Sequence, residues 1–460
     1  METHQNAAIK VKDGYRRLRI IQTAQDTGQR LADIGAGVSG ANQPSIPITV
    51  RIDPQEQYQT ILGFGGAFTE AGAHVLAQID PAQRQKVIDA YFAADTGLNY
   101  RLCRVHMNSC DFSLGNYSCD DVDGDVELRH FNIDRDRRYL VPWIKDAIRA
   151  TGRPIDLLVT PWSPPAWMKT NGKMNGGGKL KPEYRETWAR FFVQFIREYQ
   201  NEGIPVWGVS VQNEPLAVQT WDSCIFSAAE EADFVGDYLG PTLRRNGLAD
   251  QKIVIWDHNR DLVYDRAKIS LSNPKAAQYV WGIGFHWYSG DQFVNIEKTY
   301  REFSDKSLLF TEGCIEKGVK LGQWDRGEIY AHNILGDLNS GTVGWIDWNM
   351  VLDLQGGPNH AGNYCDALVV VNTATGEVFF QSSYYYMGHF SKFIERGARR
   401  IGCLVDGAYV ELAAFLNPDG TIVVVVLNRK DEALQFTLEV QGNSFAIASP
   451  GHSIQTIILE

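Results

Sequence analysis

The stretch Val206-Trp-Gly-Val-Ser-Val-Gln-Asn-Glu-Pro215 places a glutamate directly after an apolar run, and Ser307-Leu-Leu-Phe-Thr-Glu-Gly313 repeats the arrangement later in the chain. Each run has the length and composition of a β-strand. Packing does not explain a carboxylate at the end of an apolar strand, because charged side chains are rarely buried without a partner. The two stretches therefore indicate that Glu214 and Glu312 are held at the rim of a site.

The alternation of strand and helix extends outward from these stretches, from about residue 58 to 382. Eight runs are predicted to be strands: Thr60–Phe64, Tyr100–Met107, Ile155–Thr160, Val206–Gln212, Ile253–Asp257, Val280–Trp287, Ser307–Thr311 and Thr342–Asp347. The amphipathic stretches between them are Pro81–Ala93, Arg138–Ala150, Glu183–Gln200, Ala228–Leu239 and Arg326–Leu338. This order predicts a (β/α)₈ TIM barrel. A doubly wound sheet is the alternative, but no GxGxxG motif follows an early strand.

After about residue 383 the pattern changes to short β-rich runs. They are Ala408–Phe415, Thr421–Leu427, Gln435–Val440 and Ser453–Leu459, with Pro418-Asp-Gly420 as a turn. An early run, Ile46–Ile52, can join them. We predict an α/β fold with the barrel over residues 55–382 and an antiparallel β-sandwich side domain built from residues 14–54 and 383–460.

In a (β/α)₈ barrel the active site lies at the carboxyl ends of the strands. Polar and aromatic residues lie at or just beyond the ends of seven of the predicted strands: Arg104, Asp111, Trp162, Asn213, Glu214, Asp257, His258, His286, Trp287, Tyr288, Glu312, Asp347, Trp348 and Asn349. Capping or ion pairing would explain one of these residues alone. Their number favours a site at the rim.

Two carboxyl groups facing each other across a barrel mouth suit the cleavage of a glycosidic bond. One protonates the leaving oxygen, and the other attacks the anomeric carbon or activates water. The nucleophile must stay ionised, and Arg104 is a candidate for the cation that keeps it so. Asn213 supplies an amide that can bind a sugar hydroxyl.

Composition restricts the other possibilities. The net charge of −11 disfavours nucleic acid and anionic membranes as partners. The seven cysteines contain no CxxC pair and the ten histidines no HExxH motif, so we expect neither a catalytic metal nor another cofactor. No run is long enough for a transmembrane segment and the first ten residues lack a signal core, which with unpaired cysteines favours the cytoplasm. A removed secretion signal is the alternative.

The chain resembles glycoside hydrolase family 30, the family of lysosomal acid β-glucosidase (glucosylceramidase) and its bacterial relatives. The matching segments run in order over nearly the whole chain: Gly63-Phe-Gly-Gly-Ala-Phe-Thr-Glu70, Arg104-Val-His-Met-Asn-Ser-Cys-Asp-Phe112, Pro161-Trp-Ser-Pro-Pro-Ala-Trp-Met-Lys-Thr-Asn-Gly172, Gln212-Asn-Glu-Pro215, His286-Trp-Tyr288, Phe310-Thr-Glu-Gly-Cys314, Gly344-Trp-Ile-Asp-Trp-Asn349, Gly356-Gly-Pro-Asn359 and Gly388-His-Phe-Ser-Lys-Phe393.

The resemblance implies a retaining β-glucosidase that works through a covalent glucosyl intermediate. It assigns Glu214 as the acid/base and Glu312 as the nucleophile. It places the substrate-binding residues at Asp111, Trp162, Asn213, Tyr288, Trp348 and Asn363, with Arg104 and His286 in supporting positions. In β-glucosidase members, the positions of Asp111 and Trp162 hold the far hydroxyls of glucose, which favours a β-glucoside or β-glucan substrate.

Two loops depart from the glucosylceramidase pattern, at Trp221–Phe226 and Asn359–Asn363. They are expected to contact the leaving group, so ceramide is not the expected leaving group. An endo-β-1,6-glucanase and a β-xylosidase are the alternative enzymes, and a catalytically silent carbohydrate-binding protein is the alternative from another class. Linkage, exo or endo action and oligomeric state stay open.

Overall fold

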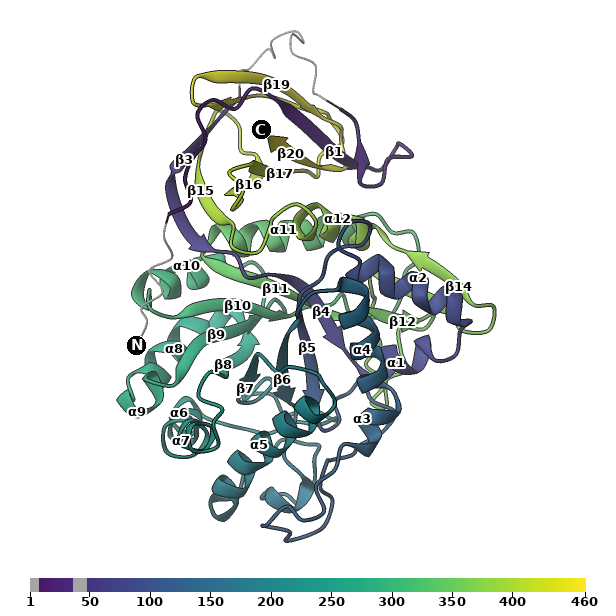
Figure 1. The fold of residues 1–460 in the computed structure, drawn as a ribbon, viewed down its shortest axis with the longest axis vertical. Coiled ribbons are helices and arrows are strands. Elements are labelled where there is room, and N and C mark those ends of the chain that lie inside the picture. Colours follow the sequence, from purple (N-terminus) through teal and green to yellow (C-terminus); the bar gives the residue numbers. More distant parts are fainter. Residues whose placement is uncertain (1–7, 36–47) are drawn as a thin grey trace. The chain divides into compact units, whose positions relative to one another are not determined.

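The computed structural model describes residues 8–35 and 48–460 (Figure 1). Residues 36–47, which belong to the predicted side-domain segment 14–54, lie outside the described residues, as do the first seven residues of the chain. The chain divides into two compact units. One contains residues up to 63 together with 322–344 and 380–460, and the other contains residues 64–321 and 345–379.

A closed eight-stranded barrel confirms the predicted (β/α)₈ fold. Its strands are β4 (Gly63–Phe68), β5 (Leu102–Met107), β6 (Asp156–Pro161), β7 (Gly208–Ser210), β8 (Lys252–Asn259), β9 (Val280–His286), β10 (Ser307–Glu312) and β11 (Thr342–Asn349). Successive strands from β4 to β10 pair in parallel. The carboxyl ends of these strands therefore meet at one mouth of the barrel, where the sequence predicts the site.

The first barrel strand lies later than predicted. The run Thr60–Phe64 crosses a junction, because strand β3 (Thr49–Thr60) ends at Thr60 and β4 begins at Gly63. Gly63 has a φ of +135°, a conformation that favours glycine and separates the two strands. The glycines that follow allow close backbone approach, because a Cβ on Gly65 would lie 1.7 Å from the carbonyl oxygen of Leu102 in β5.

Helices follow the barrel strands. The longer ones are α2 (Pro81–Phe92), α4 (Leu140–Thr151), α5 (Arg185–Asn201), α8 (Val263–Leu271), α10 (Phe293–Glu302) and α11 (Asp325–Asn339). The predicted helix Ala228–Leu239 divides into α6 (Ala228–Asp233) and a π-helical segment, Phe234–Leu239. Asp80 caps α2 by accepting a hydrogen bond from the Ala82 backbone nitrogen at 2.8 Å. Within residues 8–35 and 48–460, we find no helix that has both the length and the apolar character of a membrane span.

The other unit contains a nine-stranded sheet in the order β19-β18-β3-β15-β16-β17-β20-β1-β2. Its further strands are β1 (Leu18–Ala24), β2 (Ala32–Asp33), β15 (Arg399–Asp406), β16 (Glu411–Leu416), β17 (Ile422–Asn428), β18 (Leu434–Val440), β19 (Asn443–Ser449) and β20 (Ser453–Leu459). Side chains from strands across the sheet bury one shared apolar core. Strand β18 pairs in parallel with β3, whereas its other neighbour, β19, is antiparallel. Strands from both ends of the chain thus build this sheet.

Candidate active site

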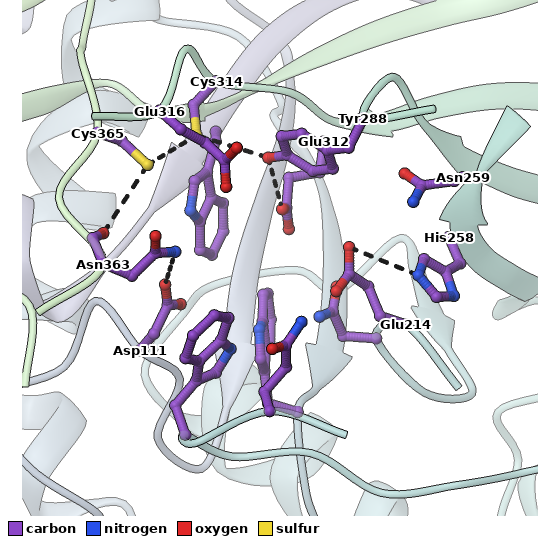
Figure 2. A pocket seen from close by; sticks show the side chains of 15 residues that line it. Asp111, Glu214, His258, Asn259, Tyr288, Glu312, Cys314, Glu316, Asn363 and Cys365 are labelled. Carbon is purple, nitrogen blue, oxygen red and sulfur yellow. Dashed lines mark hydrogen bonds and ion pairs between the residues drawn. The ribbon is translucent and has the colours of Figure 1, made fainter. Parts of the chain in front are cut away.

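A cavity of about 170 Å³ lies at the mouth of the barrel (Figure 2). Its lining contains Asp111, Trp162, Asn213, Glu214, Gln219, Trp221, His258, Asn259, Tyr288, Glu312, Cys314, Glu316, Trp348, Asn363 and Cys365. Both predicted catalytic glutamates and all six predicted substrate-binding residues are in this set. The structure therefore brings together side chains that are far apart in the sequence.

The two glutamates reach the cavity by different routes. Glu312 is the last residue of β10, whereas Glu214 lies four positions after the end of β7. The backbone nitrogen of Glu214 donates to the carbonyl oxygen of Asp257 at 3.0 Å, and Glu214 has a φ of +46°. A left-handed conformation is uncommon for a residue with a Cβ, and such residues cluster at functional sites. The turn after β7 aims the Glu214 side chain towards Glu312.

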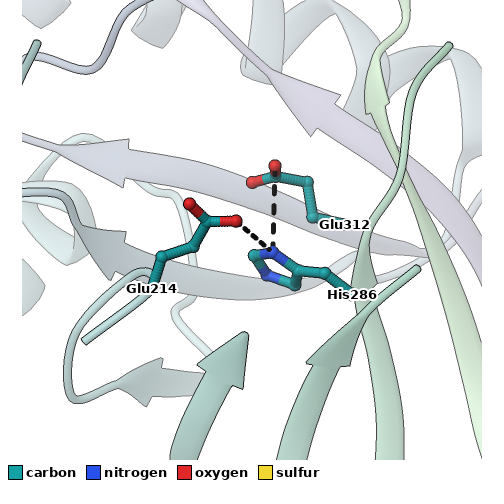
Figure 3. A group of neighbouring side chains, drawn as sticks. All are labelled: Glu214, His286 and Glu312. Atoms are coloured by element: carbon teal, nitrogen blue, oxygen red, sulfur yellow. Dashed lines mark hydrogen bonds and ion pairs between the residues drawn. The ribbon is translucent and has the colours of Figure 1, made fainter. Parts of the chain in front are cut away.

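The separation of the carboxyl groups discriminates between two hydrolytic mechanisms. One carboxylate oxygen of Glu214 lies within 4.8 Å of one of Glu312 (Figure 3). Retaining glycosidases hold their carboxyl groups about 5–5.5 Å apart, whereas inverting enzymes leave about 6.5–9.5 Å for a water molecule. The spacing here matches direct attack by one carboxylate.

Arg104 organises the floor of the site. This side chain is fully buried and donates hydrogen bonds to Glu312, to Asn213 Oδ1 at 2.8 Å and to Asp257 Oδ2 at 3.0 Å. The Tyr288 hydroxyl donates to the other oxygen of Glu312 at 3.0 Å. Both oxygens of Glu312 thus accept a hydrogen bond, and these hydrogen bonds favour the ionised form of the carboxyl group. Because the side-chain oxygen of Asn213 accepts this hydrogen bond, its amide nitrogen points away from Arg104 and can donate to another group.

His286 lies between three carboxylates. Its Nε2 is 2.9 Å from Asp257 Oδ1, and its Nδ1 is 3.1 Å from Glu214 and 4.0 Å from Glu312. Burial alone would lower the pKa of His286, but the charge of Glu312 and hydrogen bonds to Asp257 and Glu214 raise it to about 9. The imidazole is therefore protonated at neutral pH and donates from both nitrogens.

Protonation also decides what Glu214, His286 and Glu312 can bind. Their side-chain types and mutual distances match those of a metal site (Figure 3). A protonated imidazole has no free lone pair for a metal, and Arg104 already supplies a cation to Glu312. The group is therefore suited to exchanging protons between carboxylates rather than to holding a metal ion.

The buried charges couple the ionisation of the two glutamates. The acidic groups are Asp257, Glu214 and Glu312, and the cations are Arg104 and protonated His286. Burial opposes ionisation of Asp257, but Arg104 and His286 hold its pKa well below its usual range. With both glutamates ionised the cluster carries one excess negative charge, and one proton on the pair neutralises it. The two glutamates therefore titrate as a unit.

An acid needs a higher pKa than the nucleophile beside it. In the free site the shifts have the opposite order, because the pKa of Glu214 is lowered and that of Glu312 is raised. Burial would raise the pKa of Glu214, but the hydrogen bond from His286 and the charges of His258 and His286 lower it. Burial raises the pKa of Glu312 against the charges of His286 and Arg104, and the charge of Glu214 adds to the increase. In the unliganded site, Glu312 therefore holds a proton more readily than Glu214 does.

The opposite side of the cavity combines a carboxyl group with aromatic rings. Oδ2 of Asp111 accepts from the amides of Asn359 at 3.1 Å and Asn363 at 3.3 Å. Burial and the charge of Glu312 raise the pKa of Asp111 to about 7, against these two hydrogen bonds. The rings of Trp162 and Trp348 stack with centroids 5.1 Å apart. A hydroxyl-bearing ring with apolar faces fits both features.

The sequence predictions missed several residues that line the mouth of the cavity. They are Gln219, Asn259, Glu316 and the thiols of Cys314 and Cys365. Asn259 is the last residue of β8, two positions beyond the predicted end of that strand, and the others lie in loops where no strand end marks them. Asp257 was expected only at the rim, yet it is fully buried and joins Arg104 to His286. Its place directly after the apolar run Ile253–Trp256 was the available signal.

Comparisons with known proteins agree with this geometry. The model of the glycosyl hydrolase family 30 TIM-barrel domain matches residues 61–394, and that of the family 30 beta sandwich domain matches residues 397–457. The chain is 35% identical to the lysosomal acid glucosylceramidase of Mus musculus over 450 residues, which are 94% of this chain and 87% of the relative. It is 28% identical to an endo-1,6-beta-D-glucanase of Neurospora crassa, over 88% of this chain and 86% of the relative.

A solved structure has the same fold along nearly the full length. SrfJ from Salmonella typhimurium superposes with a TM-score of 0.90 at 36% identity, covering 96% of this chain and 99% of SrfJ. Two family models cover most of the chain, and they coincide with a barrel whose mouth holds two carboxyl groups at the spacing of retaining enzymes. The chain belongs to glycoside hydrolase family 30.

Proposed function

We propose that this enzyme hydrolyses β-glucosides by double displacement, with Glu312 as the nucleophile and Glu214 as the acid/base. The approach of the two carboxyl groups to within 4.8 Å carries the proposal, because it agrees with the short spacing of retaining enzymes and not with the spacing of about 6.5–9.5 Å in inverting ones. Relatives named glucosylceramidase and endo-1,6-beta-D-glucanase support β-glucosidic bonds as the substrate class.

In the first step, a carboxylate oxygen of Glu312 attacks the anomeric carbon as the bond to the leaving oxygen breaks. Arg104 and Tyr288 orient this carboxylate through their hydrogen bonds to its two oxygens. A proton passes from Glu214 to the leaving oxygen. Substrate displaces water from the cavity and adds to the burial of Glu214, which favours its protonated form before reaction.

In the second step, water hydrolyses the glucosyl ester. The ester at Glu312 carries no charge, so the repulsion that favours a protonated Glu214 disappears and the pKa of Glu214 falls. Glu214 is then a carboxylate, held by His286 at 3.1 Å, and accepts a proton from the attacking water. Water adds to the anomeric carbon, the ester bond breaks, and Glu312 is released. The low pKa of Glu214 in the free site suits this second step.

The groups around the cavity support glucose as the bound sugar. Asp111 is held by two asparagines and can bind adjacent hydroxyls of a hexose, and the indole of Trp162 lines the same cavity. The amide nitrogen of Asn213 is placed to donate to a hydroxyl beside the reacting carbon. A xylose lacks the hydroxymethyl group, so a β-xylosidase would use these contacts less completely.

The mouth of the cavity favours a sugar as the leaving group. Gln219, Asn259 and Glu316 present polar side chains there, and Trp221 adds a ring that can stack on a second sugar. These contacts support a β-glucan or a small β-glucoside over ceramide. An endo-β-1,6-glucanase is the second candidate, favoured by the same polar mouth and by the Neurospora relative.

Two assays test this proposal. Aryl β-glucoside, β-xyloside, β-galactoside and β-fucoside are compared by kcat/KM, and the glucoside is expected to be the best substrate. A β-1,6-glucan is then digested, and the products are followed by size. Early release of oligomers indicates endo action, and glucose alone indicates exo action. If the protein is inactive on all of these substrates, the proposal is contradicted.

His286 is expected to set the pH profile. The variant His286→Asn keeps a hydrogen-bond donor but removes a positive charge beside both glutamates. A neighbouring cation lowers the pKa of a carboxyl group by about 1–3 units, so its loss should raise the pKa values of the pair. Both limbs of the kcat/KM profile should move to higher pH by at least about one unit.

The matched control is His258→Asn. His258 lies 4.0 Å from Glu214, and burial lowers its pKa, so it gains its charge only in acid, whereas His286 is already charged at neutral pH. Its replacement should move the limbs much less than that of His286. Equal shifts in the two variants, or a shift of the His286 variant to lower pH, would show that the imidazolium does not hold the protons of the pair.

A further inference from the structure

Two thiols lie side by side in the wall of the active-site cavity (Figure 2). Cys314 is two residues after the nucleophile, and Cys365 is two residues after the sugar-binding candidate Asn363. Their sulfur atoms are 3.0 Å apart. Both side chains are buried, with 5% of Cys314 and 1% of Cys365 exposed. The catalytic steps described above use neither thiol.

The backbone already holds the segments of the two thiols beside each other. Cys365 pairs with Glu316 in an antiparallel bridge, and the nitrogen of Asp366 donates to the carbonyl oxygen of Ile315 at 2.8 Å. The two segments therefore run antiparallel beside each other at this point, and the thiols are diagonal neighbours across the bridge. A disulfide bond is about 2.05 Å long, so the sulfurs need to approach by about 1 Å.

We propose that Cys314 and Cys365 are a redox modification site, in which a hydroperoxide converts the two thiols into a reversible disulfide that lowers the activity of the enzyme. The cross-link itself follows from the geometry of the two segments. Its effect on activity rests on the proposed function, because it acts through the contacts of Glu312.

The chemistry balances in two steps. Hydrogen peroxide oxidises the sulfur of Cys365 to a sulfenic acid and is itself reduced to water. The thiol of Cys314 then attacks that sulfur, the S–S bond forms, and a second water leaves. Cys314 donates its hydrogen bond to Cys365, which marks Cys365 as the sulfur that ionises first. The hydrogen bond to Cys365, together with burial, raises the pKa of Cys314. The hydrogen bond from Cys314 opposes the increase at Cys365, but burial still raises the pKa of that thiol, so oxidation should be slow at neutral pH and faster in alkali.

The disulfide would alter the surroundings of the nucleophile. The Tyr288 hydroxyl lies 3.5 Å from the sulfur of Cys314 and also donates to Glu312. Moving Cys314 towards Cys365 shifts a neighbour of this hydroxyl and tethers the segment that carries Asn363. Misplacement by about 1 Å near the reacting groups can cost on the order of a hundredfold in rate. We expect at least about a tenfold loss of kcat/KM on the strength of this effect.

The test uses the full-length protein, treated with hydrogen peroxide and digested without reduction. Mass spectrometry should find a peptide pair linking Cys314 to Cys365, lighter by two hydrogen atoms. Activity on an aryl β-glucoside should fall in step with the linked fraction and return with dithiothreitol. Absence of the linked pair after complete peroxide treatment, or full activity of the linked enzyme, would overturn the proposal.

The activity of each of the variants Cys365→Ser and Cys314→Ser is measured before and after peroxide treatment. Neither variant should lose activity that dithiothreitol restores. Cys403→Ser, which removes a half-buried thiol of the nine-stranded sheet, should respond like the unaltered protein. If the reduced protein proves inactive on every β-glycoside, the proposed function fails, whereas peptide mapping still decides whether the disulfide forms.

Discussion

Replacing Glu312 with alanine is expected to lower kcat/KM on β-glucosides by on the order of 10⁴–10⁶-fold, the scale on which enzymes lose activity with their nucleophile. Without this carboxylate no glucosyl ester can form, and Arg104 loses one of its two anionic partners. Steady-state kinetics with an aryl β-glucoside measure the loss. Because Arg104 keeps Asp257 and Asn213, the variant should stay folded, which circular dichroism checks.

A chemical label separates a nucleophile from a residue that only binds. Incubation of the unaltered enzyme with a 2-deoxy-2-fluoro β-glucoside should trap the intermediate, and peptide mapping should find the label on Glu312. The matched variant is Glu316→Ala, which removes another carboxylate of the same cavity without a contact to Arg104 in the described structure. It should lose less than about tenfold and still be labelled. Label on any other residue would exclude Glu312 as the nucleophile.

The barrel could be predicted because its elements are encoded locally. Apolar strands alternate with amphipathic helices, and signals such as Asp80 and Pro81 mark where a helix begins. The errors lie at junctions. Strand β3 continues to Thr60, so the expected first barrel strand overlapped the end of a strand from the other sheet. Pairing between distant segments, such as β18 with β3, leaves no local pattern in either strand.

The sequence predicted which residues line the site but not their protonation states. The strand-end rule and the family motifs placed Glu214, Glu312 and the six binding residues in one cavity. The protonation of His286 depends on its distances to three carboxylates, which no motif states. The pKa order of the two glutamates differs from the simple expectation for the same reason. Spacing along the chain also gave no sign that Cys314 and Cys365 meet.

Loops explain most of what the sequence left open. Gln219 and Glu316 line the mouth, although neither lies at a strand end. Their positions follow from turns whose conformation depends on tertiary contacts, such as the bridge between Asn175 and Asp222. The choice of leaving group therefore depends on the part of the fold that sequence patterns describe least.

The variant Glu214→Ala is expected to lose activity according to the leaving group. On an alkyl or sugar leaving group, which departs poorly without a proton, kcat/KM should fall by about 10²–10⁴-fold, the usual contribution of general acid catalysis. On a dinitrophenyl glucoside the first step needs little acid assistance, so kcat/KM should fall far less. A plot of log kcat/KM against leaving-group pKa should become steeper than that of the unaltered enzyme.

The second step offers the sharper test of Glu214, because alanine leaves space beside the glucosyl ester and removes a negative charge. Azide can enter there and attack the anomeric carbon without a base, so it should restore turnover of the dinitrophenyl glucoside. The product should be β-glucosyl azide, since two inversions retain the configuration. Gln219→Ala, which removes a neighbouring polar group, should show neither azide rescue nor a steeper leaving-group dependence. Equal losses on all leaving groups, with no glucosyl azide formed, would exclude Glu214 from proton transfer and would assign its left-handed turn and its contact with His286 to positioning alone.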